Sequence, residues 1–453
     1  MNTTFCRIFQ FVFNYGAKAM PWRKAIRVEG PGSIGKIPEL LRKHAVTKPM
    51  LVTDKGLVKA GIAGRIAKIL TAEGFSFIQF SDVEPNPSVN TVNAAYNLYK
   101  SEGCDGIIAV GGGSPIDAAK AAAARVVRPD KSVNKLGGLL RVRKKIPPFI
   151  AVPTTAGTGS ETTIAALITD TETHHKYAIM DFSLIPLYAV LDPELTVGLP
   201  PAITAATGMD ALTHAVEAYL CWTYNTSESI QYAVDAVRDI FANLEKAYKK
   251  GGDADARQAM LTASYKAGFA FTRAGVGNVH AIAHTLGGLY NTPHGLANAV
   301  ILPKVLDDYG KAVHKKLAKL AEAVSLAGPD SGSDAEKARL FIDAVYEMNR
   351  RMGIPEGFDF IKDEDIARMA EWANAESNPL YPVPVVYSKE RFKAVIELIR
   401  IKPKAKAAAK TKAAPKAKTK VKAKSKAKTK TAPKAKAKAK TKAKTKTKAK
   451  TKK

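Results

Sequence analysis

Residues 106–117 read GIIAVGGGSPID, and this segment indicates the architecture of the first half of the chain. An apolar strand runs straight into three glycines, and a helix-forming segment follows from Ala118. Pro115 suits the first turn of that helix, where an N–H group would have no partner. Glycines at such a turn let the backbone approach a phosphate at the helix N-terminus. The segment predicts a phosphate-binding βα unit, although three glycines could also form a plain tight turn.

Similar units surround this segment. Further strands are predicted at 50–53, 75–80 and 149–152, and helices at 33–43, 56–72, 89–101 and 114–125. Alternating strands and helices predict a doubly wound parallel sheet, and we expect 26–193 to be a dinucleotide-binding α/β domain.

Residues 194–401 should form an all-helical metal-binding domain. Its predicted helices are 202–222, 227–249, 255–273, 279–286, 315–327, 334–352, 363–375 and 389–399. Gly287-Gly288 is expected to break the chain after the fourth of these helices.

The net charge of +29 is concentrated at the C-terminus. Residues 402–453 contain 24 lysines and no acidic residue, whereas the other 401 residues carry 46 basic and 41 acidic side chains. Three scattered cysteines and the lack of a long apolar run exclude a disulfide-stapled module and an integral membrane protein. The 402–453 tail is predicted to be disordered, and it could bind nucleic acid or another polyanion.

Residues 1–25 form an apolar, amphipathic extension. The run Phe5–Phe13 is interrupted by Arg7, which is unlike the uninterrupted core of a signal peptide. We expect a short helix that packs on the protein's own body. A membrane-surface anchor is the second interpretation, and a signal peptide is the last.

A metal site is indicated by the spacing of one carboxylate and several imidazoles. Asp210 and His214 are four residues apart, as are His280 and His284, and His294 follows within the next loop. Residues at this spacing share one helix face, and these side chains suit iron, zinc or cobalt. Spacing alone does not decide which of the last three histidines bind the ion.

These motifs together resemble the iron-containing alcohol dehydrogenases. The resemblance covers roughly 26–401 and is carried by 111–117, 153–162, 208–219 and 277–303. It implies that Asp210, His214, His280 and His294 hold the metal, and that His284 lies beside it as a catalytic residue. The ion would be Fe²⁺, with Zn²⁺ as an alternative.

The same resemblance implies where NAD binds. Asp54 would meet the adenosine ribose and favour NAD over NADP, because a carboxylate repels a 2′-phosphate. The pyrophosphate would lie on Gly112, Gly113 and Ser114. Further cofactor positions would be Thr154, Thr155, Thr158 and Lys176. Asp117 would act at the nicotinamide end, with a catalytic role.

The function implied is the interconversion of a primary alcohol and its aldehyde by hydride transfer to or from NAD(H). A hydroxyacid-oxoacid transhydrogenase or a lactaldehyde or diol reductase on the same scaffold is an alternative. A different class, a polyanion-binding protein whose lysine-rich tail is the functional part, is also considered. We expect a cytoplasmic homo-oligomer, dimeric or larger, without a transmembrane segment.

Overall fold

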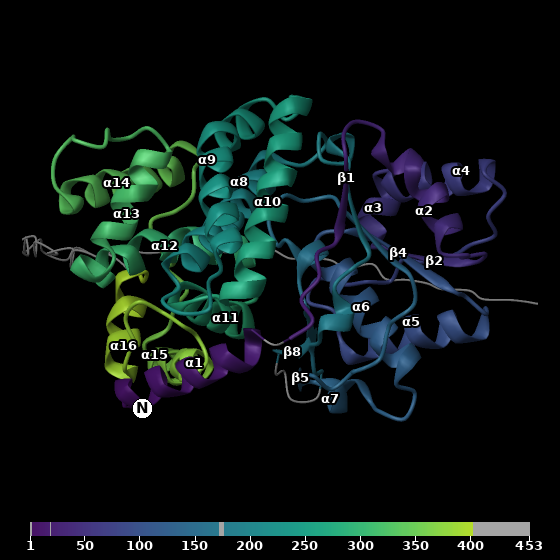
Figure 1. Ribbon diagram of the computed structural model, residues 1–453, viewed down its shortest axis with the longest axis horizontal. Coiled ribbons are helices and arrows are strands. Elements are labelled where there is room, and N and C mark those ends of the chain that lie inside the picture. The colour runs from purple at the N-terminus through teal and green to yellow at the C-terminus, as the bar shows by residue number, and fades with distance from the viewer. Residues whose placement is uncertain (1, 19, 172–175, 402–453) are drawn as a thin grey trace, which may run out of the picture. The chain divides into compact units, whose positions relative to one another are not determined.

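The computed structural model describes residues 2–18, 20–171 and 176–401, and its first half is built on a six-stranded sheet (Figure 1). The strand order is β1-β9-β6-β4-β2-β3, and every neighbouring pair is parallel. The strands are β1 (Ile26–Glu29), β2 (Pro49–Val52), β3 (Ile78–Phe80), β4 (Gly106–Gly111), β6 (Phe149–Pro153) and β9 (Tyr188–Leu191). The predicted doubly wound parallel sheet is confirmed.

Helices cover both faces of this sheet. They are the 3₁₀ helix η1 (Ser33–Lys36), α2 (Ile37–Lys43), α3 (Lys55–Lys59), α4 (Ile62–Ala72), α5 (Val89–Ser101), α6 (Gly113–Val127) and α7 (Val133–Leu136). Alternate residues of β4 face opposite cores: Ile107 packs with α5 and α6, and Ile108 packs with α2 and α4. One correction concerns 56–72, where two helices replace the single predicted one because Gly61 has φ +77°.

A small second sheet was not predicted. Its strands are β5 (Gly138–Leu139), β7 (Ala165–Thr169) and β8 (Lys176–Met180), in the order β5-β8-β7. Short 3₁₀ helices precede β7, follow β8 and follow β9: η2 (Ser160–Thr162), η3 (Phe182–Leu184) and η4 (Pro193–Leu195). The strand β8 matters for the site because Lys176 is its first residue.

The second half of the chain is helical, as predicted. Its helices are α8 (Pro201–Leu220), α9 (Ser227–Lys249), α10 (Ala254–Ala274), α11 (Asn278–Tyr290), α12 (His294–Tyr309), η5 (Gly310–Ala312), α13 (His314–Ala323), α14 (Asp334–Arg351), α15 (Asp363–Ser377) and α16 (Lys389–Leu398). One expectation was wrong, because helix α11 continues through Gly287-Gly288 to Tyr290. Helix α12 was not predicted.

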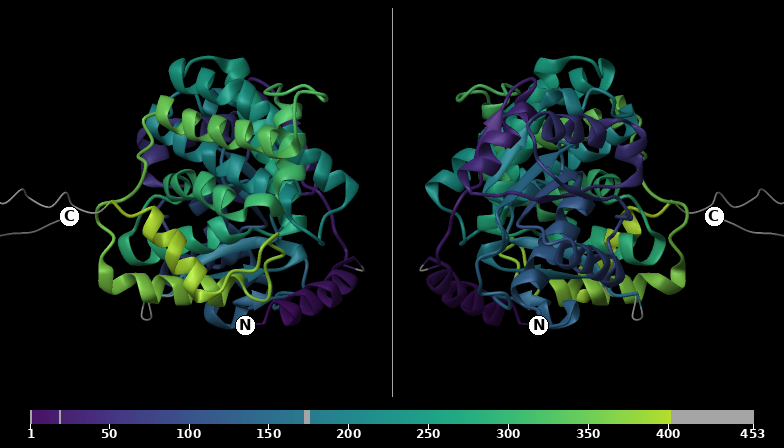
Figure 2. Two further views of the ribbon diagram at one scale, coloured as in Figure 1. Left: turned by 90° about the vertical axis from the view of Figure 1, so that its left-hand side faces the viewer. Right: turned by 90° about the vertical axis from the view of Figure 1, so that its right-hand side faces the viewer.

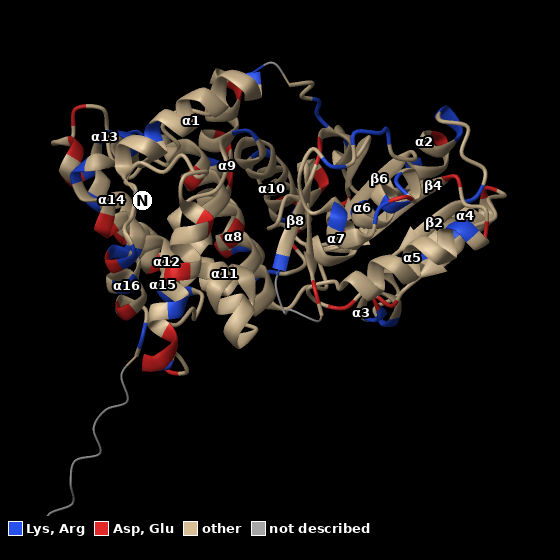
Figure 3. Cartoon of the chain, turned by 90° about the horizontal axis from the view of Figure 1, so that it is seen from below, with Lys and Arg blue, Asp and Glu red and all other residues tan. Residues whose placement is uncertain are grey.

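The N-terminal helix α1 (Thr3–Lys18) lies against the segment between α15 and α16, as two views in Figure 2 show. Gln10 and Cys6 are its buried residues. Its opposite face is apolar and exposed, and α1 is almost entirely tan when charges are coloured (Figure 3). The exposed apolar residues are Phe5, Ile8, Phe9, Phe11, Val12 and Tyr15.

None of the helices in the described part of the chain is long and apolar enough to cross a membrane. The predicted disorder of 402–453 falls outside the described residues.

Candidate active site

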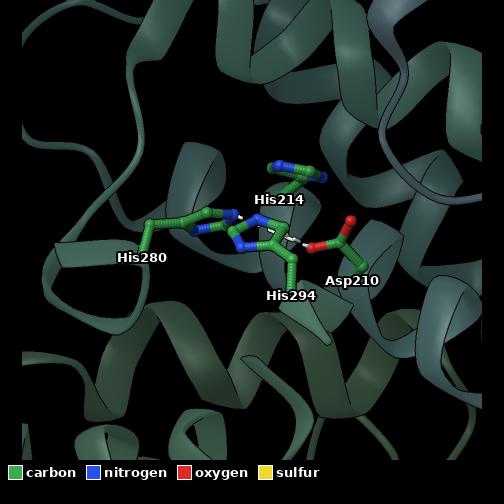
Figure 4. A group of neighbouring side chains, drawn as sticks. All are labelled: Asp210, His214, His280 and His294. Atoms are coloured by element: carbon green, nitrogen blue, oxygen red, sulfur yellow. Dashed lines mark ion pairs between the residues drawn. The ribbon is translucent and has the colours of Figure 1, made fainter. Parts of the chain in front are cut away.

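Four side chains from three helices converge in the helical half (Figure 4). Asp210 and His214 come from α8, His280 from α11 and His294 from the first position of α12. One ligand atom from each lies within 4.8 Å of the other three. Asp210 Oδ1 is 3.6 Å from Nε2 of His294 and 3.9 Å from Nε2 of His280. The residues that the resemblance named as ligands are therefore neighbours.

The approach of α12 to α8 depends on a glycine. A Cβ atom on Gly295 would lie 2.3 Å from the carbonyl oxygen of Ala206 and 3.2 Å from Cβ of Asp210. Any side chain there would push α12 away from α8. His294 could then no longer reach Asp210, so the His-Gly pair that begins α12 has a packing reason.

Burial sets the protonation of this cluster. Asp210, His214 and His280 are almost inaccessible to solvent. Desolvation raises the pKa of Asp210, lowers the pKa of His214 to about 3, and holds the pKa values of His280 and His294 well below the ordinary range. The three imidazoles are therefore neutral near pH 7, which is the form that binds a metal ion.

Glu217, one helical turn beyond His214, supports His280. Its carboxylate accepts hydrogen bonds from the backbone N–H groups of Gly277 (2.9 Å) and Val279 (2.8 Å) at the start of α11. It also lies 2.6 Å from Nδ1 of His280. A carboxylate on the far nitrogen of an imidazole fixes the ring so that Nε2 faces the ion. Glu217 was not predicted from the sequence, although its spacing places it on the helix face of Asp210 and His214.

The contacts of Asn298 indicate that the cluster suits a cation. This fully buried side chain lies one turn beyond His294, and its Nδ2 donates to Asp210 Oδ1 at 2.7 Å. The same nitrogen is 3.1 Å from Nε2 of His280 and 3.2 Å from Nε2 of His294. Its Oδ1 has no hydrogen-bond partner among the described residues. Asp210 Oδ1 and the Nε2 atoms of His280 and His294 therefore all face the one NH₂ group of Asn298. Three electron-pair donors gathered around one weakly positive group fit a divalent cation.

His284 lies next to this cluster but takes part in a different interaction. Its ring stacks on that of His294 with centroids 5.2 Å apart. Its Nδ1 is 2.5 Å from Oε1 of Glu376, a residue of α15. Glu376 in turn accepts a hydrogen bond from the hydroxyl of Tyr381 at 2.6 Å. Ninety-two residues separate His284 from Glu376, so no local spacing could have predicted the pair.

The two small-residue loops meet at the edge where the parallel strands end. A Cβ atom on Gly112 would lie 3.3 Å from Oγ1 of Thr155, and one on Gly113 would lie 3.0 Å from Cγ2 of Thr158. The N–H of Thr154 donates to the carbonyl oxygen of Gly111. Because Gly113 begins helix α6, this edge combines glycines that the threonine loop approaches closely with a helix N-terminus. It has the character of a phosphate-binding turn.

Asn86 joins this edge to the helical half. Its backbone N–H faces Oγ of Ser114 at 3.4 Å, and its side-chain oxygen accepts from Nζ of Lys176 at 2.9 Å. Its Nδ2 is 3.3 Å from Oδ1 of Asn291, the residue that follows α11. Asn86 was not predicted to join the site, although its positive φ of 57° suits an asparagine between two prolines.

Asp117 and Asp54 make local contacts. Asp117 is buried on α6 and accepts from Oγ of Ser160 (2.6 Å) and from the N–H of Leu167 (3.1 Å). It thereby ties η2 and β7 to α6. Asp54 follows β2 and caps α3, because its Oδ1 accepts from the N–H of Leu57 at 2.9 Å. The predicted cofactor and catalytic roles of these two residues stay predictions.

Both halves of the chain match sequence models of the same protein family. The sequence model described as iron-containing alcohol dehydrogenase matches residues 26–193, and the model of the C-terminal domain of that family matches 204–399. The 1,3-propanediol dehydrogenase of Citrobacter freundii is 39% identical over 358 residues, which is 77% of this chain and 92% of that protein.

Solved structures agree as well. A crystal structure of 1,3-propanediol oxidoreductase has a TM-score of 0.80 at 36% identity, covering 83% of this chain and 98% of the other. Sulfoacetaldehyde reductase from Bifidobacterium kashiwanohense, solved in complex with NAD⁺, has a TM-score of 0.74 at 28% identity, covering 84% and 99%. The prediction of an oxidoreductase that interconverts alcohols and aldehydes is confirmed at this level. The chain belongs to the iron-containing alcohol dehydrogenase family.

Proposed function

We propose that this protein interconverts a small primary alcohol or diol and its aldehyde, using NAD(H) and a divalent metal ion held by Asp210, His214, His280 and His294. The observation that carries the proposal is the convergence of one buried carboxylate and three imidazoles within 4.8 Å. Neutral imidazoles beside a carboxylate match the preference of Fe²⁺ or Zn²⁺. A bound ion of this kind supplies Lewis-acid activation of the alcohol oxygen, and NAD supplies the hydride acceptor.

The chain's own residues then bind, orient and move a proton. Glu217 orients His280, and Asn298 contacts Asp210 and two of the histidines. His284 accepts the hydroxyl proton at Nε2, because its Nδ1 is engaged by Glu376. Oxidation of one alcohol therefore yields one aldehyde, one NADH and one proton, which passes from His284 to water.

The proposed NAD site lies at the edge of the sheet where the parallel strands end. Gly112, Gly113 and Ser114 form the pyrophosphate turn, and the threonine loop 154–158 lies against them. Asp54 meets the adenosine ribose and selects NAD over NADP by charge repulsion. Lys176 and Asp117 lie towards the nicotinamide end. The NAD⁺ complex of the related sulfoacetaldehyde reductase supports this cofactor.

Metal removal tests the proposal. Protein stripped with a chelator should lose alcohol-dependent NADH formation, and anaerobic Fe²⁺ should restore it. Zinc should occupy the same ligands, because the site binds it more tightly than iron, but should support slower turnover. Full activity of the metal-free protein would contradict the proposed mechanism. A panel of short primary alcohols, diols, lactaldehyde and hydroxyacids would separate the dehydrogenase from the reductase and transhydrogenase alternatives.

The diol possibility is favoured by one observation, the similarity to 1,3-propanediol dehydrogenase. We also propose that the protein works as a homo-oligomer in the cytoplasm and that its lysine-rich tail binds polyanions. Sedimentation of the full chain tests the first of these points. Salt-dependent binding to DNA tests the last, because the binding should weaken steeply as salt rises.

A further inference from the structure

A chain of hydrogen bonds runs from His284 to the N-terminal helix. Glu376 Oε1 receives two contacts, from Nδ1 of His284 at 2.5 Å and from the hydroxyl of Tyr381 at 2.6 Å. The side chains of His284 and Glu376 are 23% and 32% exposed, so the pair borders accessible space rather than lying in a sealed core. Burial would raise the pKa of Glu376, but the hydrogen bonds from His284 and Tyr381 hold this pKa below its ordinary value. Glu376 is therefore an ionised carboxylate near pH 7.

Tyr381 belongs to the segment 378–388 between α15 and α16, which contains three prolines, at 379, 382 and 384. Prolines have no N–H, so such a segment cannot bond its carbonyl groups in a regular ladder. Its carbonyl oxygens need donors from elsewhere. Helix α1 donates to four of these carbonyl groups, and residues such as Trp222 and Tyr224 donate to others.

Two residues of α1 make these contacts. Nε2 of Gln10, which is fully buried, donates to the carbonyl oxygens of Pro379 (2.8 Å) and Tyr381 (2.7 Å). The guanidinium of Arg7 donates to the carbonyl oxygens of Val383 (2.7 Å) and Pro384 (2.9 Å). Four carbonyl groups of one proline-rich segment are thus bound by one turn of α1.

We propose that Glu376 and Tyr381 are positioning residues for His284, and that α1 holds them in place through Gln10 and Arg7. The carboxylate fixes the His284 tautomer that carries its proton on Nδ1, which leaves Nε2 free. The reactive orientation of this ring thus depends on a helix outside the family match, which begins at residue 26. This inference deepens the proposed function, in which His284 accepts the hydroxyl proton.

The first experiment uses the full chain with Glu376→Leu and Glu376→Gln. The matched control is Glu371→Gln on the same helix, where an exposed carboxylate pairs with Lys389. Elemental analysis should find the same metal content in all variants. With NAD and a primary alcohol, Glu376→Leu should lower kcat about 10–100-fold with little change in KM, and Glu376→Gln should lower it less. The control should match the wild type.

A second readout does not need activity. In zinc-loaded protein labelled with ¹⁵N-histidine, the His284 ring should show its proton on Nδ1 in the wild type and a tautomer mixture in Glu376→Leu. If the wild type oxidises no alcohol, the proposed function fails while this spectrum still tests the positioning. Unchanged tautomer and unchanged kcat in Glu376→Leu would overturn the inference. Loss of metal from that variant would overturn it as well, because the residue would then support the metal site.

The role of α1 is tested separately with Gln10→Leu. Its control is Asn14→Ala, which removes a contact of the same helix to Thr223 and none to the proline-rich segment. Gln10→Leu should speed amide exchange at Tyr381 and lower kcat without loss of metal, and Asn14→Ala should do neither. If Gln10→Leu fails to fold, Tyr381→Phe removes the hydroxyl contact alone and should shift the His284 tautomer in the same direction. Equal effects of Gln10→Leu and Asn14→Ala would refute the specific link to the segment.

Discussion

Replacing Glu217 by Gln probes the support of the metal site from one turn away. The carboxylate uses both oxygens, for the N–H groups of Gly277 and Val279 and for Nδ1 of His280, at 2.6–2.9 Å. A glutamine keeps one acceptor oxygen and places an NH₂ group against donors at the other position. At least one buried N–H then loses its partner, which costs about 1–3 kcal/mol of unfolding free energy. Because the His280 ring also loses its fixed orientation, metal affinity should fall about 10–100-fold.

Two measurements check this prediction. The metal dissociation constant is obtained by competition with a chelator, and the unfolding free energy of the metal-free protein by denaturant titration. Glu356→Gln, a substitution at an exposed position, serves as the control and should change neither. A dissociation constant within about twofold of the wild type would refute the reasoning, because it would mean that the Glu217–His280 contact does not hold the ring.

Four further substitutions test other residues of the chain. His294→Ala should lose the metal and nearly all activity, whereas His284→Ala should keep about one metal per subunit and slow turnover about 10–100-fold; elemental analysis of both decides between them. Asp54→Ala should weaken discrimination against NADP, measured as kcat/KM for the two cofactors, and should cost about 1 kcal/mol through the lost helix cap. Asp105 accepts three hydrogen bonds from 47–48, which lower its pKa although partial burial alone would raise it. The stability that Asp105→Asn removes should therefore be full near neutral pH and vanish as pH falls below about 4, by denaturant titration across pH.

The sequence predicted best where local pattern and tertiary role agree. The strand at 106–111 is buried throughout and the glycine turn follows it directly in the chain, so the local sequence pattern was enough to predict both. The helix break at Gly287-Gly288 was wrong for the opposite reason. Two glycines cost a helix only about 1 kcal/mol each, and packing of α11 against α12 and α15 outweighs that cost.

The candidate site residues also differ in whether local spacing or tertiary packing brings them to the site. Glu217 and Asn298 lie one turn from predicted ligands, at His214 and His294, and a wider use of helix spacing would have found them. Glu376 could not have been found that way, because only the packing of α15 brings it to His284.

The position of α1 has a practical consequence for anyone who shortens or extends this protein. A chain trimmed to begin at Ile26, where the family match starts, would keep every proposed metal and NAD residue but would lose the two hydrogen bonds from Gln10 to the carbonyl groups of Pro379 and Tyr381. The kcat of the trimmed protein should then differ from that of the full chain, because His284 would be positioned differently. An affinity tag is also poorly placed at this end, since its linker would begin next to the helix that clamps the proline-rich segment. Trp222, whose indole N–H donates to Gln10 Oε1, offers a fluorescent reporter of whether that clamp is intact.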